Sequence, residues 1–291
     1  MRKENFMNIT KDCVACIVGQ IDKAIVHLNL DEHKAKCIQE EVLKKSQSFE
    51  FDKTPPYVAR EVYEFLAQQT NCSDPLERLK QESIQNALEY VPFIEKKIRQ
   101  EEDKLFTAIK AAVAGNVIDF GAKEQFHLED EINKVFHTHF AIDHYAKLAK
   151  QIENKENILI LADNAGENVF DKILIKIIKR LYPNKNITYA TRGKPIINDI
   201  TTKEALQIGI DKFAKVISTG VDTPGLELSR ANTTFRNIFE KAELIISKGM
   251  GNFECLETLK DKRIFFVFKV KCNVVANAIS KEVGDIILKQ G

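Results

Sequence analysis

The chain has 291 residues, and its 43 basic and 42 acidic side chains give a formal net charge of +1 at pH 7. This charge provides no general attraction for nucleic acid or an anionic membrane surface, and no apolar run approaches the roughly 20 residues of a membrane-spanning helix. With 44% hydrophobic residues, six cysteines and no apolar leader, the composition indicates a folded, reduced, cytoplasmic protein rather than a disordered or disulfide-rich secreted one.

The first part of the chain has the pattern of helices. Residues 1–114 contain a single glycine, Gly19, and their apolar residues recur three and four positions apart. This spacing predicts helices near residues 13–28, 34–47, 56–69, 75–90 and 105–113, and we expect Gly115 to end the last of them. We therefore predict a helical N-terminal domain over residues 1–114.

The pattern changes to short, uninterrupted apolar runs from residue 157 onward, which is typical of strands covered on both faces. The runs are Ile158–Ala162, Ile187–Ala190, Val216–Ile217, Leu244–Ile246 and Ile264–Phe268. Amphipathic helices separate most of them, most clearly from Val169 to Leu181. This alternation predicts an α/β domain over residues 115–291, with a mostly parallel sheet covered by helices.

Polar residues follow each predicted strand, at the edge where ligands bind in open α/β sheets. Asp163, Asn164 and Asp199 offer oxygen ligands, which favour Mg²⁺ or Mn²⁺ over metals that prefer sulfur. Cationic side chains that could hold phosphoryl oxygens also follow predicted strands, namely Arg192, Lys248 and Lys271. The helix beginning near Ala165 would add backbone N–H groups. The set predicts phosphoryl hydrolysis, in which a divalent ion neutralises charge and activates water.

Each of these features also has a purely structural interpretation. Asn164-x-x-Glu167 and Thr201-x-x-Glu204 both match the capping box of a helix N-terminus, although Asp199 lies outside the second box. Thr219-Gly220 and Lys248-Gly249 could be simple turns, and Lys269 with Lys271 could mark an exposed strand edge. The convergence of all these residues on one edge favours a functional site.

Cys13 and Cys16 form a CxxC pair on the apolar stripe of the first predicted helix. Their position on that stripe favours buried thiols. Metal binding with His27, His33 or Cys37, and redox chemistry, are the alternatives.

Taken in order, the motifs of the chain resemble those of the ARMT-like damage-control phosphatases. The motifs are Gly115-Asn116-Val117-Ile118-Asp119, Asp163-Asn164-Ala165-Gly166-Glu167, Arg192-Gly193-x-Pro195-x-x-Asn198-Asp199, Ser218-Thr219-Gly220, Lys248-Gly249-Met250-Gly251-Asn252-Phe253-Glu254 and Lys269-x-Lys271-Cys272. The Cys13-x-x-Cys16 pair resembles the mark of the largely prokaryotic subfamily.

This resemblance implies a helical N-terminal domain packed on a Rossmann-like three-layer α/β/α domain, with Mn²⁺, Co²⁺, Ni²⁺ or Mg²⁺ bound between them. It implies that Asp163, Asn164 and Asp199 are the metal ligands. It also implies that Lys271 binds the substrate phosphate and is catalytic together with these three residues. The substrate-binding residues that it implies are Asn116, Asp119, Arg192, Lys248, Gly249 and Asn252.

We therefore predict a metal-dependent, damage-control phosphatase that hydrolyses small phosphometabolites such as sugar phosphates. The attacking group is either a metal-activated water or the Asp163 carboxylate. The alternatives are an S-adenosylmethionine-dependent carboxyl methyltransferase and a non-catalytic metal- or metabolite-binding protein. The predicted partner is a small phosphorylated metabolite, with no nucleic acid and no membrane, and the sequence predicts no oligomeric state.

Overall fold

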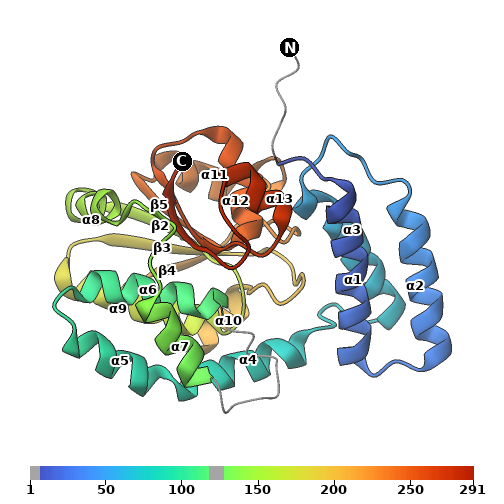
Figure 1. Ribbon diagram of the computed structural model, residues 1–291, viewed down its shortest axis with the longest axis horizontal. Helices are drawn as coiled ribbons and strands as arrows, with labels where there is room; N and C mark the ends of the chain where they lie inside the picture. Colours follow the sequence, from blue (N-terminus) through green and yellow to red (C-terminus); the bar gives the residue numbers. More distant parts are fainter. Residues whose placement is uncertain (1–6, 118–127) are drawn as a thin grey trace.

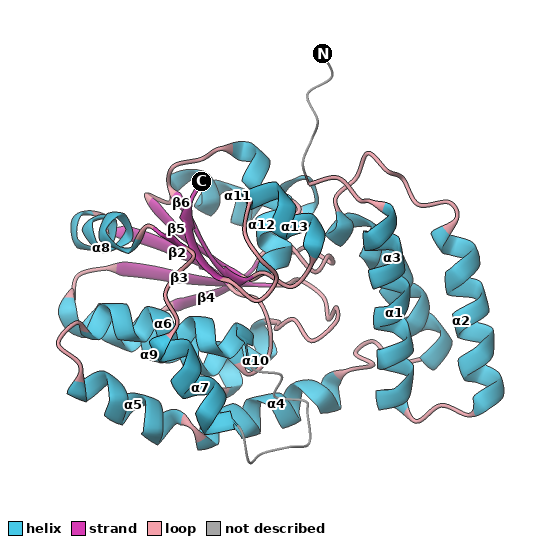
Figure 2. Ribbon diagram, viewed as in Figure 1, coloured by secondary structure: helices cyan, strands magenta, loops and turns pink. Residues whose placement is uncertain are grey.

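The computed structural model describes residues 7–117 and 128–291 of the chain, so Asp119 lies outside the described residues. A single seven-stranded sheet forms its centre, in the order β1-β7-β6-β5-β2-β3-β4 (Figure 2). The strands are β1 (Ile142–Asp143), β2 (Asn157–Leu161), β3 (Asn186–Thr191), β4 (Lys215–Ser218), β5 (Leu244–Lys248), β6 (Ile264–Lys269) and β7 (Ile286–Gln290).

Strands β2 to β6 are parallel, as their uninterrupted apolar runs predict. β7, which the sequence analysis did not predict, runs antiparallel to β6, and the two-residue β1 pairs with β7. Both faces of the sheet are buried. In β2, Ile158 and Ile160 belong to the core on one face, while Leu159 and Leu161 belong to the core on the other.

Helices cover the two faces of this sheet (Figure 1). One face is covered by α4 (Glu77–Glu89), α5 (Val91–Gln100), α6 (Lys104–Val117) and α9 (Glu167–Leu181), among others. The opposite face is covered by α11 (Thr233–Lys241), α12 (Met250–Leu256) and α13 (Asn273–Ile279). Helices α7 (Leu128–His137), α8 (Tyr145–Asn154) and α10 (Thr202–Gln207) also contribute to the core on the first face. The three-layer α/β/α prediction is confirmed.

Three N-terminal helices form a separate unit beside the sheet, with a hydrophobic core of their own (Figure 1). They are α1 (Lys11–Leu28), α2 (Glu32–Ser46) and α3 (Pro55–Thr70). The side chains of Thr10, Asp31 and Thr54 cap their N-termini.

The sheet core extends past the predicted boundary at residue 114. Ile84 of α4, Ile94 of α5 and Ile109 of α6 all belong to it, so these three helices pack with the sheet rather than with α1–α3. Gly115 does not end α6, which continues to Val117. A Cβ atom at Gly115 would lie 2.9 Å from the Cα atom of Glu167, so this glycine allows α6 to approach α9 closely.

No helix in residues 7–117 or 128–291 is both long and apolar enough to cross a membrane.

Candidate active site

The loops that follow β2 and β3 are joined to each other by their backbones. The Ala165 N–H donates to the Asn198 carbonyl at 2.9 Å, and the Ile200 N–H donates to the Asp163 carbonyl at 2.9 Å. Asn164 and Asp199 are thereby paired in an isolated antiparallel bridge. The three predicted metal ligands, which are up to 36 positions apart in sequence, therefore lie together at the carboxyl edge of the sheet.

The buried guanidinium group of Arg192 connects the carboxylates of Asp163 and Asp199. Its Nε atom donates to Asp199 Oδ2 at 2.5 Å, its Nη2 atom to Asp163 Oδ1 at 3.3 Å, and its Nη1 atom to Asn252 Oδ1 at 3.0 Å. Arg192 is only 2% exposed. The predicted substrate-binding arginine is thus a residue that fixes the orientation of two carboxylates, because all these contacts lie within the protein.

Glu167 adds a third carboxylate that the sequence analysis did not assign to the site. Asn164 Nδ2 donates to Asp163 Oδ2 at 2.8 Å and to Glu167 Oε1 at 2.9 Å. Because α9 begins at Glu167 with Gly166 as its N-cap, the capping-box interpretation of Asn164 and Glu167 is wrong. The other box, Thr201 with Glu204, is confirmed at the start of α10.

The backbone N–H groups expected to bind phosphate before α9 already have protein partners. The Ala165 N–H is used in the bridge between the loops, and the Gly166 N–H donates to Asn168 Oδ1 at 3.0 Å. The start of this helix therefore holds the ligand loop in shape rather than offering these two donors to a ligand.

Lys248, predicted to bind substrate phosphate, is fully buried at the end of β5. Its Nζ atom donates to Asp171 Oδ1 at 2.6 Å, to Glu167 Oε2 at 3.1 Å and to the Ala112 carbonyl at 3.0 Å. Burial alone would lower the pKa of Lys248, but the carboxylates of Asp171 and Glu167 raise that pKa above its ordinary value. Lys248 therefore stays charged and holds Glu167 in place.

A cleft of about 930 Å³ lies over the loop pair, between the sheet edge and helices α1 and α3. Asp163, Asn164, Asp199 and Lys271 all line it, so the four predicted catalytic residues share one cavity. Four of the predicted substrate-binding residues do not line the cleft and lie beneath its surface. They are Arg192, Lys248, Gly249 and Asn252. The side chain of Asn116 and all of Asp119 lie outside the described part of the chain.

Gly249 packs against the carboxyl group of Asp163. Its φ angle is +80°, and a Cβ atom at this position would lie 1.9 Å from Asp163 Oδ2. Only glycine has both the required backbone conformation and the space. The start of α12 therefore packs directly against Asp163.

Asn252 fixes the same region with its amide group. Its Nδ2 atom donates to the Ala162 carbonyl at 3.1 Å and to the Lys248 carbonyl at 2.7 Å, while its Oδ1 accepts from the Leu226 N–H at 2.9 Å. The predicted substrate-binding amide thus joins the ends of β2 and β5.

Cys13 and Cys16 of α1 also line the cleft. Cys13 is buried, as its place on the apolar stripe predicts, but Cys16 is exposed, so the prediction of two buried thiols is wrong for Cys16. His33 and Cys37 contact each other on α2, with 3.9 Å between Nδ1 and Sγ. In the described parts of the chain, no three His, Cys, Asp or Glu side chains are arranged to hold one metal ion.

The charges at the cleft floor make it suited to a cation. Burial raises the pKa of Asp163 well above its ordinary value, and the carboxylates of Glu167 and Asp199 raise it further. The pKa of Asp199 is also raised by burial, against the opposing effect of Arg192. Added positive charge would relieve this crowding, and the amide of Asn164 would supply the third protein ligand. These oxygen donors fit a divalent ion such as Mn²⁺ or Mg²⁺.

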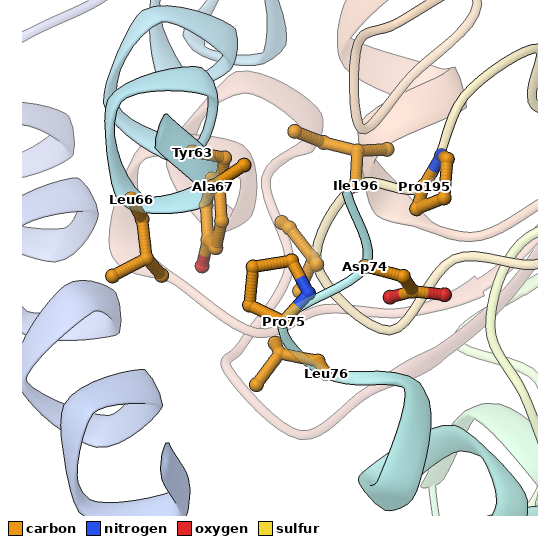
Figure 3. A pocket seen from close by; sticks show the side chains of 9 residues that line it. Tyr63, Leu66, Ala67, Asp74, Pro75, Leu76, Pro195 and Ile196 are labelled. Atoms are coloured by element: carbon orange, nitrogen blue, oxygen red, sulfur yellow. The ribbon is translucent and has the colours of Figure 1, made fainter. Parts of the chain in front are cut away.

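The loop that carries Asp199 is anchored in the α1–α3 unit. Ile196 is buried in the core of that unit, and it lines a small cavity of about 20 Å³ with Tyr63 and Leu66 of α3 (Figure 3). Ile197 has a φ angle of +47°, which is strained for a β-branched residue. The helical unit thus holds one end of the ligand loop.

Comparison with known proteins identifies the family. Residues 9–287 match the damage-control phosphatase ARMT1-like domain. The chain is 32% identical to damage-control phosphatase PH1575 of Pyrococcus horikoshii, over 97% of each chain, and 27% identical to a damage-control phosphatase of Archaeoglobus fulgidus, over 97% of this chain and 99% of that one. The crystal structure of a DUF89 family protein from Pyrococcus horikoshii (ph1575) superimposes with a TM-score of 0.90 at 30% identity, covering 98% of this chain and 99% of that chain.

The relatives' names confirm the predicted enzyme class rather than the methyltransferase or non-catalytic alternatives. The chain belongs to the damage-control phosphatase ARMT1-like family, and it is a phosphatase.

Proposed function

We propose that this chain is a divalent-metal-dependent phosphatase that hydrolyses small phosphomonoesters in the cleft between the sheet edge and the α1–α3 unit. The observation that supports the proposal is the backbone bridge between Asn164 and Asp199, beside which the side chains of Asp163, Asn164 and Asp199 line one cleft. A cleft of about 930 Å³ is large enough for a phosphorylated metabolite.

Asp163, Asn164 and Asp199 would hold the metal ion. A divalent ion bound there would neutralise charge on the phosphoryl group. Arg192 keeps the two aspartates in a fixed orientation, so little reorganisation is needed when a ligand arrives. Glu167, itself held by Lys248, keeps the Asn164 amide in position.

Lys271 is proposed to bind the substrate phosphate from the wall of the cleft. Its positive charge already acts on Asp163, whose pKa it lowers against the larger effect of burial. A phosphoryl group next to Asp163 would therefore lie within the field of Lys271. The Lys271 backbone N–H donates to Met250 Sδ at 3.4 Å, which ties this residue to the start of α12.

The test is a panel of small phosphomonoesters assayed for phosphate release with Mn²⁺, Co²⁺, Ni²⁺ and Mg²⁺. We expect turnover of at least one ester with a divalent ion and none after chelation with EDTA. Full activity after chelation would contradict the metal assignment, and tight ligand binding without phosphate release would contradict hydrolysis.

We predict that Lys271→Ala mainly raises KM and lowers kcat/KM by roughly 10- to 100-fold, the effect of losing a hydrogen bond to a charged group. Steady-state kinetics on the best ester of the panel measures it. Lys262→Ala is the matched control, because Lys262 is exposed at the opposite end of β6 and does not line the cleft. An unchanged kcat/KM in Lys271→Ala would remove this residue from the phosphate site.

A further inference from the structure

Glu254 has a carboxyl group that the proposed chemistry does not yet use. It lies on α12, is only 9% exposed, and lines the same cleft as Asp163 and Lys271. In the part of the chain that the structure describes, no hydrogen bond or ion pair engages this carboxyl group. Its oxygens are not among the fully enclosed unpaired atoms, so they face the cleft. Because buried polar groups nearly always have partners, a ligand is the expected partner here.

The position of α12 places Glu254 on the wall of the cleft that Asp163 also lines. The helix starts directly behind Asp163, where Gly249 leaves no room for a Cβ atom. Glu254 lies five residues further on, or about 7.5 Å along the helix axis, and helical side chains tilt toward the N-terminus of their helix. Met250, Gly251 and Glu254 all line the cleft, as residues on one helix face should.

The surroundings of Glu254 keep it uncharged at neutral pH. Burial raises the pKa of Glu254 to about 8, and no other group shifts it substantially. Its charge acts on three thiols, namely Cys16 of α1, Cys272 before α13 and Cys255 on its own helix. The other ionisable groups that line the same cleft are Asp12 and Lys23 of α1, Lys269 and Lys271 at the end of β6, and the carboxyl groups of Asp163, Glu167 and Asp199. Burial raises the pKa of Cys255 and Cys272, and partial covering of the exposed Cys16 side chain raises its pKa too, so all three thiols are neutral as well. A carboxylic acid in such surroundings has a proton to donate.

We propose that Glu254 is the general acid of the reaction, which donates its proton to the leaving oxygen of the phosphomonoester; this inference rests on the proposed function. The bond between phosphorus and the ester oxygen breaks, and its electron pair stays on that oxygen, which takes the proton from Glu254. A bond forms between phosphorus and the attacking oxygen. An attacking water releases a proton to solvent, whereas attack by Asp163 gives an acyl phosphate that a water molecule then hydrolyses, which frees the carboxylate and releases a proton to solvent. The Glu254 carboxylate regains a proton from solvent water, and the products are an alcohol and inorganic phosphate.

The test compares two kinds of ester with Glu254→Gln. p-Nitrophenyl phosphate releases a phenolate stable enough to leave without a proton, whereas alkyl phosphates such as glycerol 3-phosphate release an alkoxide that needs one. We expect Glu254→Gln to lose about 10²- to 10⁴-fold in kcat on alkyl phosphates and little on p-nitrophenyl phosphate. Glu257→Gln is the matched control, because Glu257 is also 9% exposed but is paired with Lys289 and does not line the cleft.

The pH dependence and a direct titration provide further readouts. Because the protonated form is the active one, kcat/KM on alkyl phosphates should fall as the pH rises through about 8, and this fall should be absent in Glu254→Gln. In ¹³C-glutamate-labelled protein, one carboxyl resonance should titrate near pH 8 in the wild type and be missing from the variant. Glu254→Ala, with the same two esters, replaces the glutamine variant if the latter does not fold.

Several outcomes would overturn the assignment of Glu254. An equal loss on both esters would indicate a packing role, and no loss on alkyl phosphates would remove Glu254 from the reaction. A wild-type enzyme that hydrolyses p-nitrophenyl phosphate but no alkyl phosphate would also contradict a general acid. Failure of the proposed function is distinguishable, because the wild type would then hydrolyse neither ester with any of the four metals.

Discussion

Asp163→Asn is expected to lower kcat/KM by at least about 10³-fold, with manganese binding lost in isothermal titration calorimetry. The change removes one charged ligand from a set of three, and metal-assisted charge stabilisation contributes several kcal/mol to such reactions. Asp163→Ala should behave in the same way. The same loss is not expected for Asp211→Asn, an identical change at an exposed position of the surface.

The stability of Asp163→Asn separates a functional role from a structural one. The pKa of Asp163 is raised in the folded state, so its ionised form costs stability once the pH exceeds the value of the unfolded chain. Without metal at pH 7, the variant should therefore unfold at the same temperature as the wild type or above it. A variant that is inactive because it is unfolded, or one that retains full activity, would contradict the assignment.

Lys248→Met is expected to cost about 3–5 kcal/mol in the free energy of unfolding, the usual penalty for removing one partner of a buried ion pair. Lys248 is fully buried, and its loss leaves the carboxylates of Glu167 and Asp171 without their cation. Activity should fall as well, because Glu167 holds the amide of Asn164.

Urea denaturation followed by circular dichroism measures this effect. Lys44→Met is the control, since Lys44 forms an exposed ion pair with Glu41 on α2 and should change stability by less than about 1 kcal/mol. A loss of similar size in both variants would show that Lys248 is not paired as the structure describes.

The strands could be predicted where the sequence contains an uninterrupted apolar run of about five residues. Ile158–Ala162 and Ile264–Phe268 are uninterrupted apolar runs because helices cover both faces of the sheet. β7 was missed because only Ile286 to Leu288 are apolar, and three residues do not distinguish a strand from a helix. The two-residue β1 carries no detectable pattern.

The packing partners of the helices could not be predicted in the same way. The periodicity of α4, α5 and α6 shows that each has an apolar face, but not which surface that face contacts. Their place before the glycine-rich part of the chain suggested a helical domain, whereas Ile84 and Ile109 pack in the core of the sheet. The point where glycine becomes frequent in the sequence is therefore not the point where the helices begin to pack against the sheet.

Within the site, the positions of the proposed ligand residues were easier to predict than those of the residues that support them. Asp163 and Asp199 follow neighbouring parallel strands, and such strand ends share one edge of a sheet. Lys248 also ends a strand, but its partner Asp171 is 77 positions away on α9, and no local pattern reveals that pair. The sequence analysis included Glu254 in a motif but gave it no role, because only the structure shows that its buried carboxyl group has no protein partner among the described residues.

The anchoring of Ile196 in the α1–α3 core has a thermodynamic consequence. Two residues separate this isoleucine from Asp199, and α1 and α3 themselves line the cleft, so we expect ligand binding in the cleft and the docking of α1–α3 to be linked equilibria. Any ligand that tightens around Asp199 must also strengthen the attachment of those helices, by the same free energy. Sequence changes in the part of the α1–α3 core that does not line the cleft can therefore change the dissociation constant of the ligand.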